Sequence, residues 1–263
     1  YAVYNNSIVS GVTLTAGSNA YISVNFSVSD ADGAANINDA SASVNISLAG
    51  EQTRLNSTCK KIESSGTAAN YSCQVMLWYF DKNGNWAIGV NVTDQNGNNA
   101  TNASSKITVN PLTGFALGPT TLAWVAIAPG ATNQTTTSPP RLNNTGNQDI
   151  VEGNIAVNST NLVGETTDTQ SLFSANFTVS NMTGAPKPEC NFGNYSEGTA
   201  TTMNVSGASF TAIGGANLSR GNFTPNSGAA QEDLYVCLTI AGSELSSQQY
   251  STHSKGAWTV QIT

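Results

Sequence analysis

Tyr21-Ile22-Ser23-Val24-Asn25-Phe26-Ser27-Val28 alternates apolar and polar side chains along its length. A period of two is typical of a β-strand that packs one face against a core and turns the other to solvent. The same phase recurs over residues 44–48 and 86–92. We find no convincing stretch with the apolar spacing of an amphipathic helix. The sequence therefore predicts an all-β protein.

Turn-forming residues separate the predicted strands. The clearest turns are Ala31-Asp32-Gly33, Lys82-Asn83-Gly84-Asn85, Gln95-Asn96-Gly97-Asn98 and Thr183-Gly184. Gly accepts the positive φ that many turns require, and Asn and Asp side chains bond to their own backbone. Many short strands with a turn roughly every ten residues predict a β-sandwich rather than a helical or α/β fold.

Three motifs occur in both halves of the chain, in the same order. Residues 25–33 match 176–184, Tyr71-Ser72-Cys73 matches Tyr235-Val236-Cys237, and residues 84–90 match 256–262. An ordered repeat predicts two copies of one module. We place the boundary at residues 110–111, which gives an N-terminal domain over 1–110 and a C-terminal domain with longer loops over 111–263. The strand register of the second copy stays open, because Cys73 shares the phase of Val75 whereas Cys237 opposes Val236.

The chain is rich in acceptor motifs for N-linked glycans. Only 10% of its residues are charged, so another group must keep the surface hydrated. Composition alone would give about 7 Asn-x-Ser/Thr motifs, or sequons, which is fewer than the chain contains, and the excess favours selection for glycans. The alternative interpretation is that the sequons arise by accident in loops rich in Asn, Ser and Thr. Asn25, Asn45 and Asn91 fall on the polar side of predicted strands, where a glycan would not disturb a core. The predicted sites number 17: Asn5, Asn25, Asn45, Asn56, Asn70, Asn91, Asn99, Asn102, Asn133, Asn143, Asn158, Asn176, Asn181, Asn194, Asn204, Asn217 and Asn222.

The four cysteines are Cys59, Cys73, Cys190 and Cys237. None forms the closely spaced pair of a zinc or thioredoxin-type site. Pairing neighbours in sequence gives one disulfide in each predicted domain, Cys59–Cys73 and Cys190–Cys237, although other connectivities remain open. Disulfides are expected in an oxidising compartment, so we predict an extracellular location at a cell surface.

Charge excludes some partners. The net charge is −7 and no run of Lys and Arg is present, which argues against nucleic acid and anionic lipid. No apolar stretch reaches the ~20 residues of a membrane span. The chain begins at Tyr1 rather than Met, and we expect that a signal segment has been removed.

Catalytic chemistry has little support. His253 is the single histidine and stands in a polar stretch, where an exposed loop residue is expected. No Gly-x-Ser-x-Gly elbow is present, and no acidic pair stands out as a glycosidase dyad, although two carboxylates distant in sequence could meet in space. We therefore predict that the chain is not an enzyme and needs no cofactor beyond its glycans.

Calcium is the remaining chemical hypothesis. Oxygen-bearing side chains alternate in three loops, which suits a hard cation. The other interpretation is ordinary turn chemistry, and none of the loops completes an EF-hand. The candidate ligands are Asp30, Asp32, Asp81, Asn83, Asp94 and Asn96.

Three features together resemble archaeal secreted surface proteins built from immunoglobulin-like modules. They are Ser29-Asp30-Ala31-Asp32-Gly33 at a strand end, the Tyr-x-Cys followed by Gly-x-Trp, and the run Trp124-Val125-Ala126-Ile127-Ala128-Pro129-Gly130 leading to residues 142–147. The resemblance implies two tandem immunoglobulin-like β-sandwich domains and a structural, self-associating role, as in S-layer proteins and donor-strand pilin-like filaments. In this chain the Trp follows the second Cys, which is the Cys of the Tyr-x-Cys motif. In antibody domains the Trp lies between the two Cys residues.

Three functions follow for testing. The first is a subunit of a surface filament or S-layer that associates with copies of itself, and whose N-terminal residues 1–9 pair with a neighbour's sheet edge; the alternative is that they form a first strand in their own sheet. The second is an adhesin or carbohydrate-binding module that uses Tyr4, Tyr79 and Phe80 and has other surface proteins or glycans as partners. The third is a secreted hydrolase.

Overall fold

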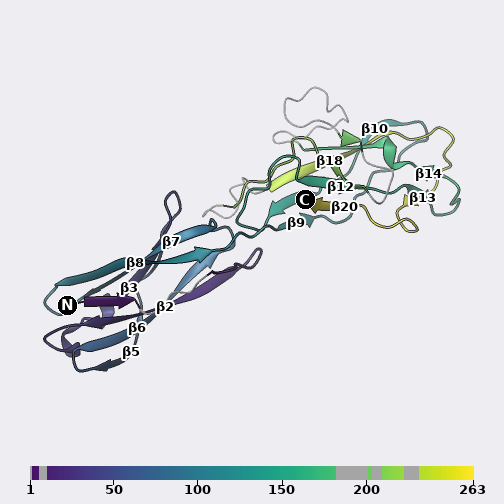
Figure 1. The fold of residues 1–263 in the computed structure, drawn as a ribbon. Helices are drawn as coiled ribbons and strands as arrows, with labels where there is room; N and C mark the ends of the chain where they lie inside the picture. The colour runs from purple at the N-terminus through teal and green to yellow at the C-terminus, as the bar shows by residue number, and fades with distance from the viewer. Residues whose placement is uncertain (1, 6–10, 182–200, 203–208, 222–230) are drawn as a thin grey trace. The chain divides into compact units, whose positions relative to one another are not determined.

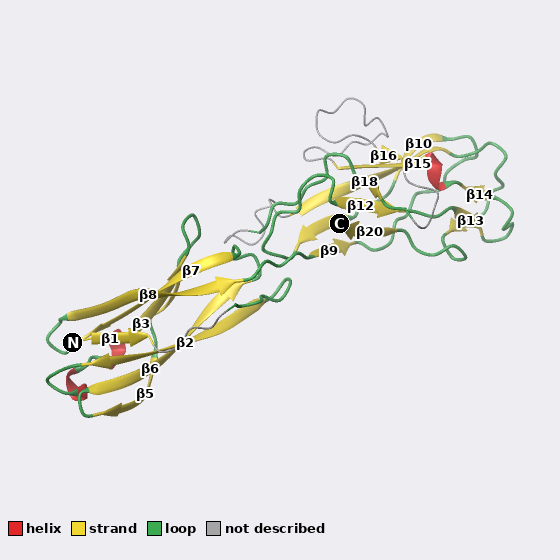
Figure 2. Cartoon of the chain, in the orientation of Figure 1, coloured by secondary structure: helices red, strands yellow, loops and turns green. Residues whose placement is uncertain are grey.

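The computed structural model describes residues 2–5, 11–181, 201–202, 209–221 and 231–263. These residues are almost entirely strands and loops, with short 3-10 turns at Ala34–Asn36, Asp39–Ser41 and Ser174–Asn176 (Figure 2). The chain divides into two compact units. Unit 1 holds Tyr1–Gly114 together with Thr145–Gln148 and Gly221, and unit 2 holds most of the remaining chain. No helix in the described part is long and apolar enough to cross a bilayer.

Unit 1 consists of two four-stranded antiparallel sheets (Figure 1). Their orders are β1-β2-β6-β5 and β4-β3-β7-β8. The strands are β1 (Ala2–Asn5), β2 (Asn19–Ser29), β3 (Ser43–Ser47), β4 (Arg54–Asn56), β5 (Lys60–Ser65), β6 (Ala68–Trp78), β7 (Gly84–Thr93) and β8 (Asn99–Val109).

The core of unit 1 lies between these sheets. Ile22, Val24, Phe26 and Val28 of β2 are buried, as the alternation predicts. They face buried residues of β3 and β7 such as Ile46 and Trp86. Phe26 stacks on Tyr71 with ring centroids 5.4 Å apart. Burying apolar side chains on the inner faces stabilises the pair of sheets as a sandwich.

A disulfide joins Cys59, just before β5, to Cys73 in the middle of β6. This confirms the first of the two expected pairings. Cys237 is fully buried in unit 2 and no described cysteine is a free thiol. Cys190 lies outside the described residues, so the Cys190–Cys237 pairing stays a prediction.

Unit 2 contains one larger sheet and two smaller ones. The larger sheet has the order β16-β15-β18-β11-β9 with β10 also on β18, and the smaller ones are β17-β12-β20 and β14-β13-β19. The strands are β9 (Phe115–Gly118), β10 (Thr132–Thr135), β11 (Arg141–Asn144), β12 (Ile155–Asn158), β13 (Leu162–Gly164), β14 (Ser171–Leu172), β15 (Phe177–Asn181), β16 (Thr201–Thr202), β17 (Thr211–Ala212), β18 (Gln231–Ile240), β19 (Tyr250–Ser251) and β20 (Thr259–Ile262).

The two units share one strand order. In unit 1 β1-β2-β6-β5 lie side by side, and in unit 2 β9-β11-β18-β15 do so, with each neighbouring pair antiparallel. The pair β3-β7 in the other sheet of unit 1 likewise corresponds to β12-β20 in unit 2. Each set also has the same order along the chain. The Tyr-x-Cys motifs therefore lie in corresponding strands, and the Gly-x-Trp motifs lie at the start of β7 and directly before β20.

One of the three sequence matches is wrong. Residues 25–33 begin in β2 and run past its end, whereas residues 177–181 form β15, whose place in the sheet corresponds to β5. Residues 182–184 lie outside the described part. The strand that corresponds to β2 is β11, extended by β10. The facing of Tyr-x-Cys also differs, because Tyr71 is buried whereas Tyr235 is half-exposed. The Tyr of the Tyr-x-Cys motif therefore faces the core in β6 but not in β18, and this difference accounts for the change of phase seen in the sequence of the second copy.

Candidate functional site

Unit 2 contains an apolar cavity of about 810 Å³. Its walls come from residues 117–129, from the inner faces of β15 and β18, and from residues 245–260. Among the described residues that line it there is no Asp, Glu, Lys, Arg or His. A cavity of this volume with an uncharged lining suits an apolar occupant that carries no charge.

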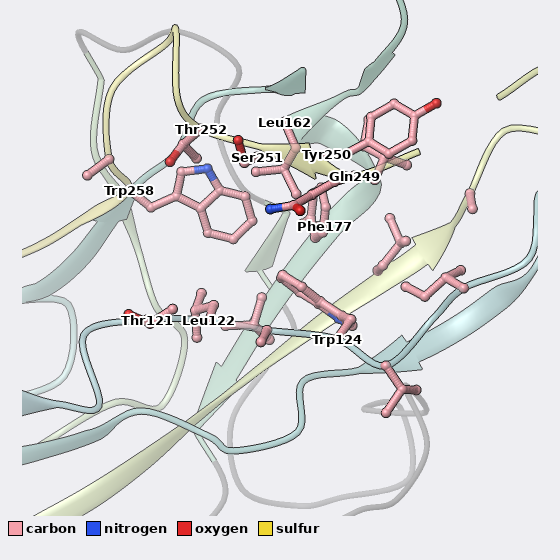
Figure 3. A pocket seen from close by; sticks show the side chains of 18 of the residues that line it. Thr121, Leu122, Trp124, Leu162, Phe177, Gln249, Tyr250, Ser251, Thr252 and Trp258 are labelled. Carbon is pink, nitrogen blue, oxygen red and sulfur yellow. The ribbon is translucent and has the colours of Figure 1, made fainter. Parts of the chain in front are cut away.

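Three aromatic rings form the centre of the cavity wall (Figure 3). Phe177 of β15 lies 4.9 Å from Trp258 and 5.4 Å from Trp124, measured between ring centroids. Both indoles have a backbone partner, because Trp124 Nε1 donates to Gln134 O and Trp258 Nε1 donates to Thr160 O. The indole N–H groups are thereby satisfied, and the ring faces and edges remain as apolar contact surface.

The polar side chains at the rim are mostly engaged with one another. Gln248 Oε1 accepts from the backbone N–H groups of Thr166 and Thr167 at 2.9 and 2.7 Å. The Tyr250 hydroxyl donates to Gln170 Oε1 at 2.9 Å. These bonds hold residues 246–250 in place, so that this side of the cavity is built by a hydrogen-bonded loop rather than by a strand ladder.

The segment of residues 119–128, which we call the strap, forms the opposite wall. Leu122 and Trp124 point into the cavity in Figure 3, and Ile127 also packs against the core of unit 2. Val125, which lies between Trp124 and Ile127 in the sequence, is 66% exposed. None of the described strands pairs with the strap. Its backbone bond to another segment is from Thr137 N to Ala123 O at 2.8 Å. The strap therefore packs through its side chains, and most of its backbone N–H and C=O groups make no backbone hydrogen bond in the described structure.

One edge of β20 is also open. In the described residues β20 pairs with β12 only, from Ile155↔Ile262 to Asn158↔Thr259. Thr263 N donates to Asn154 O, so by the alternation of an antiparallel ladder Gln261 and Thr259 also bond to β12. The N–H and C=O groups of Val260 and Ile262 consequently point to the open edge. The side chains of the same two residues pack on the core.

The sequons fall into exposed and buried groups. Asn45, Asn99, Asn133 and Asn217 are exposed. The half-exposed ones are Asn25, Asn56, Asn70, Asn91, Asn102, Asn143 and Asn176. The side chain of Asn5 and the residues Asn194, Asn204 and Asn222 lie outside the described part. Most described sequons are thus placed where a glycan can project into solvent, as proposed from the alternation.

Asn158 and Asn181 are the exceptions, with side chains 7% and 2% exposed. The Asn181 amide donates to Gly215 O at 2.8 Å and to Glu232 Oε1 at 2.5 Å. Glu232 is itself buried, and burial raises its pKa to about 7. A glycan on Asn181 would replace one of these amide hydrogens and would need space inside the core.

Three of the proposed calcium ligands have other partners in the structure. Asp94 Oδ1 accepts from the backbone N–H of Asn96 and of Asn98, both at 2.8 Å, and Asp30 Oδ1 accepts from Asp32 N at 2.9 Å. These bonds are the ordinary turn chemistry described above. Asp81 instead forms a buried ion pair with Arg54. The described residues contain no group of three or more His, Cys, Asp or Glu side chains that could hold a metal, and calcium binding stays a prediction.

Two other proposed residues can be placed. His253 is exposed, with its Nδ1 3.0 Å from Ser251 Oγ and no described carboxylate on the ring. Phe80 was expected to be an exposed sugar-stacking ring, and this is wrong, because it is 2% exposed and stacks on Trp78. Tyr79 is half-buried and packs its edge on Phe80, and the side chain of Tyr4 lies outside the described part.

The cavity was missed at the level of sequence, although a signal for it exists. The two longest intervals without a sequon are residues 103–132 and 223–263. The first contains the strap, and the second contains β20 and the loop of residues 245–258. These two walls of the cavity therefore carry no glycan acceptor, whereas the wall from β12 and β15 lies beside Asn158 and Asn176.

Comparison with known proteins adds little. No protein-family model and no curated protein matches the chain. One solved structure, described as BspA_C_WT, shares 12% identity over 90% of this chain and 87% of its own, with a TM-score of 0.20. A TM-score this low carries no argument about function.

Proposed function

We propose that the chain is a structural subunit of a glycosylated extracellular assembly, a surface filament or an S-layer, and that it is not an enzyme. Its two units are tandem immunoglobulin-like sandwiches, since the orders β1-β2-β6-β5 and β4-β3-β7-β8 resemble the ABED and CFG sheets of that fold. Copies associate when an extended segment of one copy enters the cavity of unit 2 of another. Residues 1–9 are the donor segment of this proposal.

The observation that carries this proposal is the open edge of β20 beside the apolar cavity. An unpaired strand edge presents N–H and C=O groups that favour pairing with another chain. Two edges of unit 1 are protected, because Val12 pairs with Val109 of β8, and β5 carries Lys60, Lys61 and a bulge before Glu63. The contrast supports β20 as an edge kept open for a partner.

The composition of the cavity lining and that of residues 1–9 support these residues as the donor segment. The cavity lining carries no charged side chain, and residues 1–9 contain no Asp, Glu, Lys or Arg. In this subunit Ala2–Asn5 pair with Phe26–Ser29 of β2, which is the alternative arrangement of a first strand in its own sheet. Since β20 also has four residues, exchange would replace one four-residue pairing by another that in addition fills a cavity.

Refolding at high concentration tests the proposal. The full chain is expected to form polymers visible by electron microscopy, whereas a chain without residues 1–9 is expected to stay monomeric with an unchanged β-sheet circular dichroism spectrum. A Ser23→Ala variant, altered on the exposed face of β2, is the matched control and should polymerise. A full chain that remains monomeric after refolding contradicts the proposal.

A carbohydrate-binding role is a second candidate, now at a different place from the one expected. Trp124, Trp258 and the rim residue Gln249 combine aromatic faces with a side-chain amide, the groups that commonly hold sugars. Binding on a glycan array that Trp258→Ala abolishes and Trp78→Ala retains would favour this role. Absence of binding to any glycan would remove it.

A further inference from the structure

Leu55 of β4 is an apolar side chain that unit 1 leaves exposed. It is 66% exposed on the outer face of the sheet β4-β3-β7-β8, because Arg54 before it points inward and is buried. Single exposed apolar residues are common on proteins, and the neighbour of Leu55 is what distinguishes it. In the ladder between β3 and β4 it lies directly opposite Asn45, the acceptor residue of a sequon.

The side chain of Asn45 lies low on the same face of the sheet. A Cβ atom at Gly89 of β7 would come within 2.6 Å of Asn45 Oδ1, so the Asn45 side chain occupies the space that this glycine leaves open. Among the described residues, none forms a hydrogen bond with the Asn45 amide. A sugar attached to its Nδ2 therefore breaks no bond of the described structure and begins close to the surface of the sheet.

Asn56, the acceptor next to Leu55 in the chain, is placed differently. Its Nδ2 donates to Gln74 O of β6 at 2.7 Å. It also pairs with Val44, which is buried, so the alternation of the strand turns its side chain away from the outer face on which Leu55 lies. Of the two sequons beside Leu55, the one at Asn45 is therefore the one whose sugar can reach it.

We propose that the first sugar of a glycan on Asn45 packs its apolar face on Leu55. Directly opposite residues of an antiparallel ladder have Cβ atoms about 4.5–5.5 Å apart, a distance that a pyranose ring attached at Nδ2 can span. The C–H face of the ring then removes apolar surface of Leu55 from water, while its hydroxyl groups stay hydrated. The inference rests on the glycosylation in the proposed function and adds a protein surface that binds one particular glycan.

Hydroxyl-radical footprinting of the native, full-length glycosylated chain tests this contact. Radicals oxidise accessible Leu side chains, and peptide mass spectrometry measures the rate at Leu55. The variant Asn45→Gln removes the acceptor and should raise this rate about threefold, because oxidation follows accessible surface and a packed ring covers most of a side chain that is 66% exposed. Asn91→Gln removes an acceptor on the same face that pairs with Ser43, and as the matched control it should leave the rate unchanged.

Glycopeptide analysis of the same samples separates the outcomes. If Asn45 is occupied and Leu55 is oxidised equally fast in the parent and in Asn45→Gln, the glycan points to solvent and the contact is overturned. Equally slow oxidation in both assigns the cover of Leu55 to another partner, such as a second copy, and also overturns it. Both results leave the glycosylated assembly standing. A bare Asn45 overturns the contact, and bare sequons throughout the chain would contradict the proposed function as well.

Discussion

The ring of Trp258 lies 6.3 Å from the ring of Trp124, edge to face, although one belongs to the residues preceding β20 and the other to the strap. Phe177 touches both rings from β15. These contacts connect the two walls of the cavity across an otherwise open side of unit 2. The cavity thus keeps its shape without a strand inside it.

Replacing Trp258 with Ala should destabilise unit 2. A fully buried Trp→Ala change costs about 3–5 kcal/mol, and since Trp258 is only half-buried we expect about 2 kcal/mol. Urea unfolding followed by circular dichroism measures the loss. Val125→Ala on the outer side of the strap is the control and should stay within about 0.5 kcal/mol of the parent. Equal stability of the two variants would show that the aromatic cluster does not support the unit.

Glycan occupancy should follow exposure. Asn45, Asn99 and Asn133 are exposed and should be occupied, whereas Asn181 should be bare because its amide hydrogens bond to Gly215 and Glu232 inside the core. Glycopeptide mass spectrometry of native material measures each site. A fully occupied Asn181 in folded protein would contradict the placement of β15.

Removing the Cys59–Cys73 disulfide should lower the stability of unit 1. The bridge closes a short loop, and the chain-entropy relation assigns about 3 kcal/mol to a loop of about 15 residues. The double variant Cys59→Ser, Cys73→Ala should therefore unfold at a lower temperature in differential scanning calorimetry. Ser57→Ala, exposed beside the bridge, should not. An unchanged unfolding temperature in the double variant would assign the bridge no stabilising role.

Stability should also depend on pH through Glu232. Burial raises its pKa to about 7 in the folded chain, above the value of 4.5 of an ordinary Glu. Between these two values the folded state binds a proton that the unfolded state has released. The free energy of unfolding should thus rise as the pH falls from 7, and this gain should be complete below about 4.5.

Chemical unfolding at a series of pH values measures this slope. Glu232→Gln carries no charge, so it should flatten the dependence, while its amide can accept only one of the two hydrogen bonds that the carboxylate accepts from Asn181 and Asn217. Glu244→Gln changes an exposed carboxyl and should leave the profile as it is. The same slope in Glu232→Gln as in the parent would assign the dependence to other groups.

Much of unit 1 could be predicted from alternation alone. Phe26 and Trp86 are buried where the period of two places them, because β2 and β7 each have a partner sheet on one side and solvent on the other. Alternation was misleading in matching residues 25–33 to residues 176–184. A short run of apolar and polar residues describes any half-buried strand, so it does not distinguish β2 from a strand at the place of β5.

The cavity was harder to predict, for a physical reason. Periodicity reports which side chains are buried, and Leu122 and Trp124 do pack inward. Periodicity does not report whether the backbone N–H and C=O groups have hydrogen-bond partners. The strap and one edge of β20 are open because such partners are missing there in the described structure. Sequon spacing carried that information indirectly, through the long intervals before Asn133 and after Asn222.

Electron cryomicroscopy of the isolated native surface material tests the central claim most directly. We predict a regular filament or lattice of this chain, with glycan density on the outer sheet faces and one extended strand of a neighbouring copy between the strap and β20. Single subunits, or an assembly whose contacts leave the cavity of unit 2 empty, would contradict it.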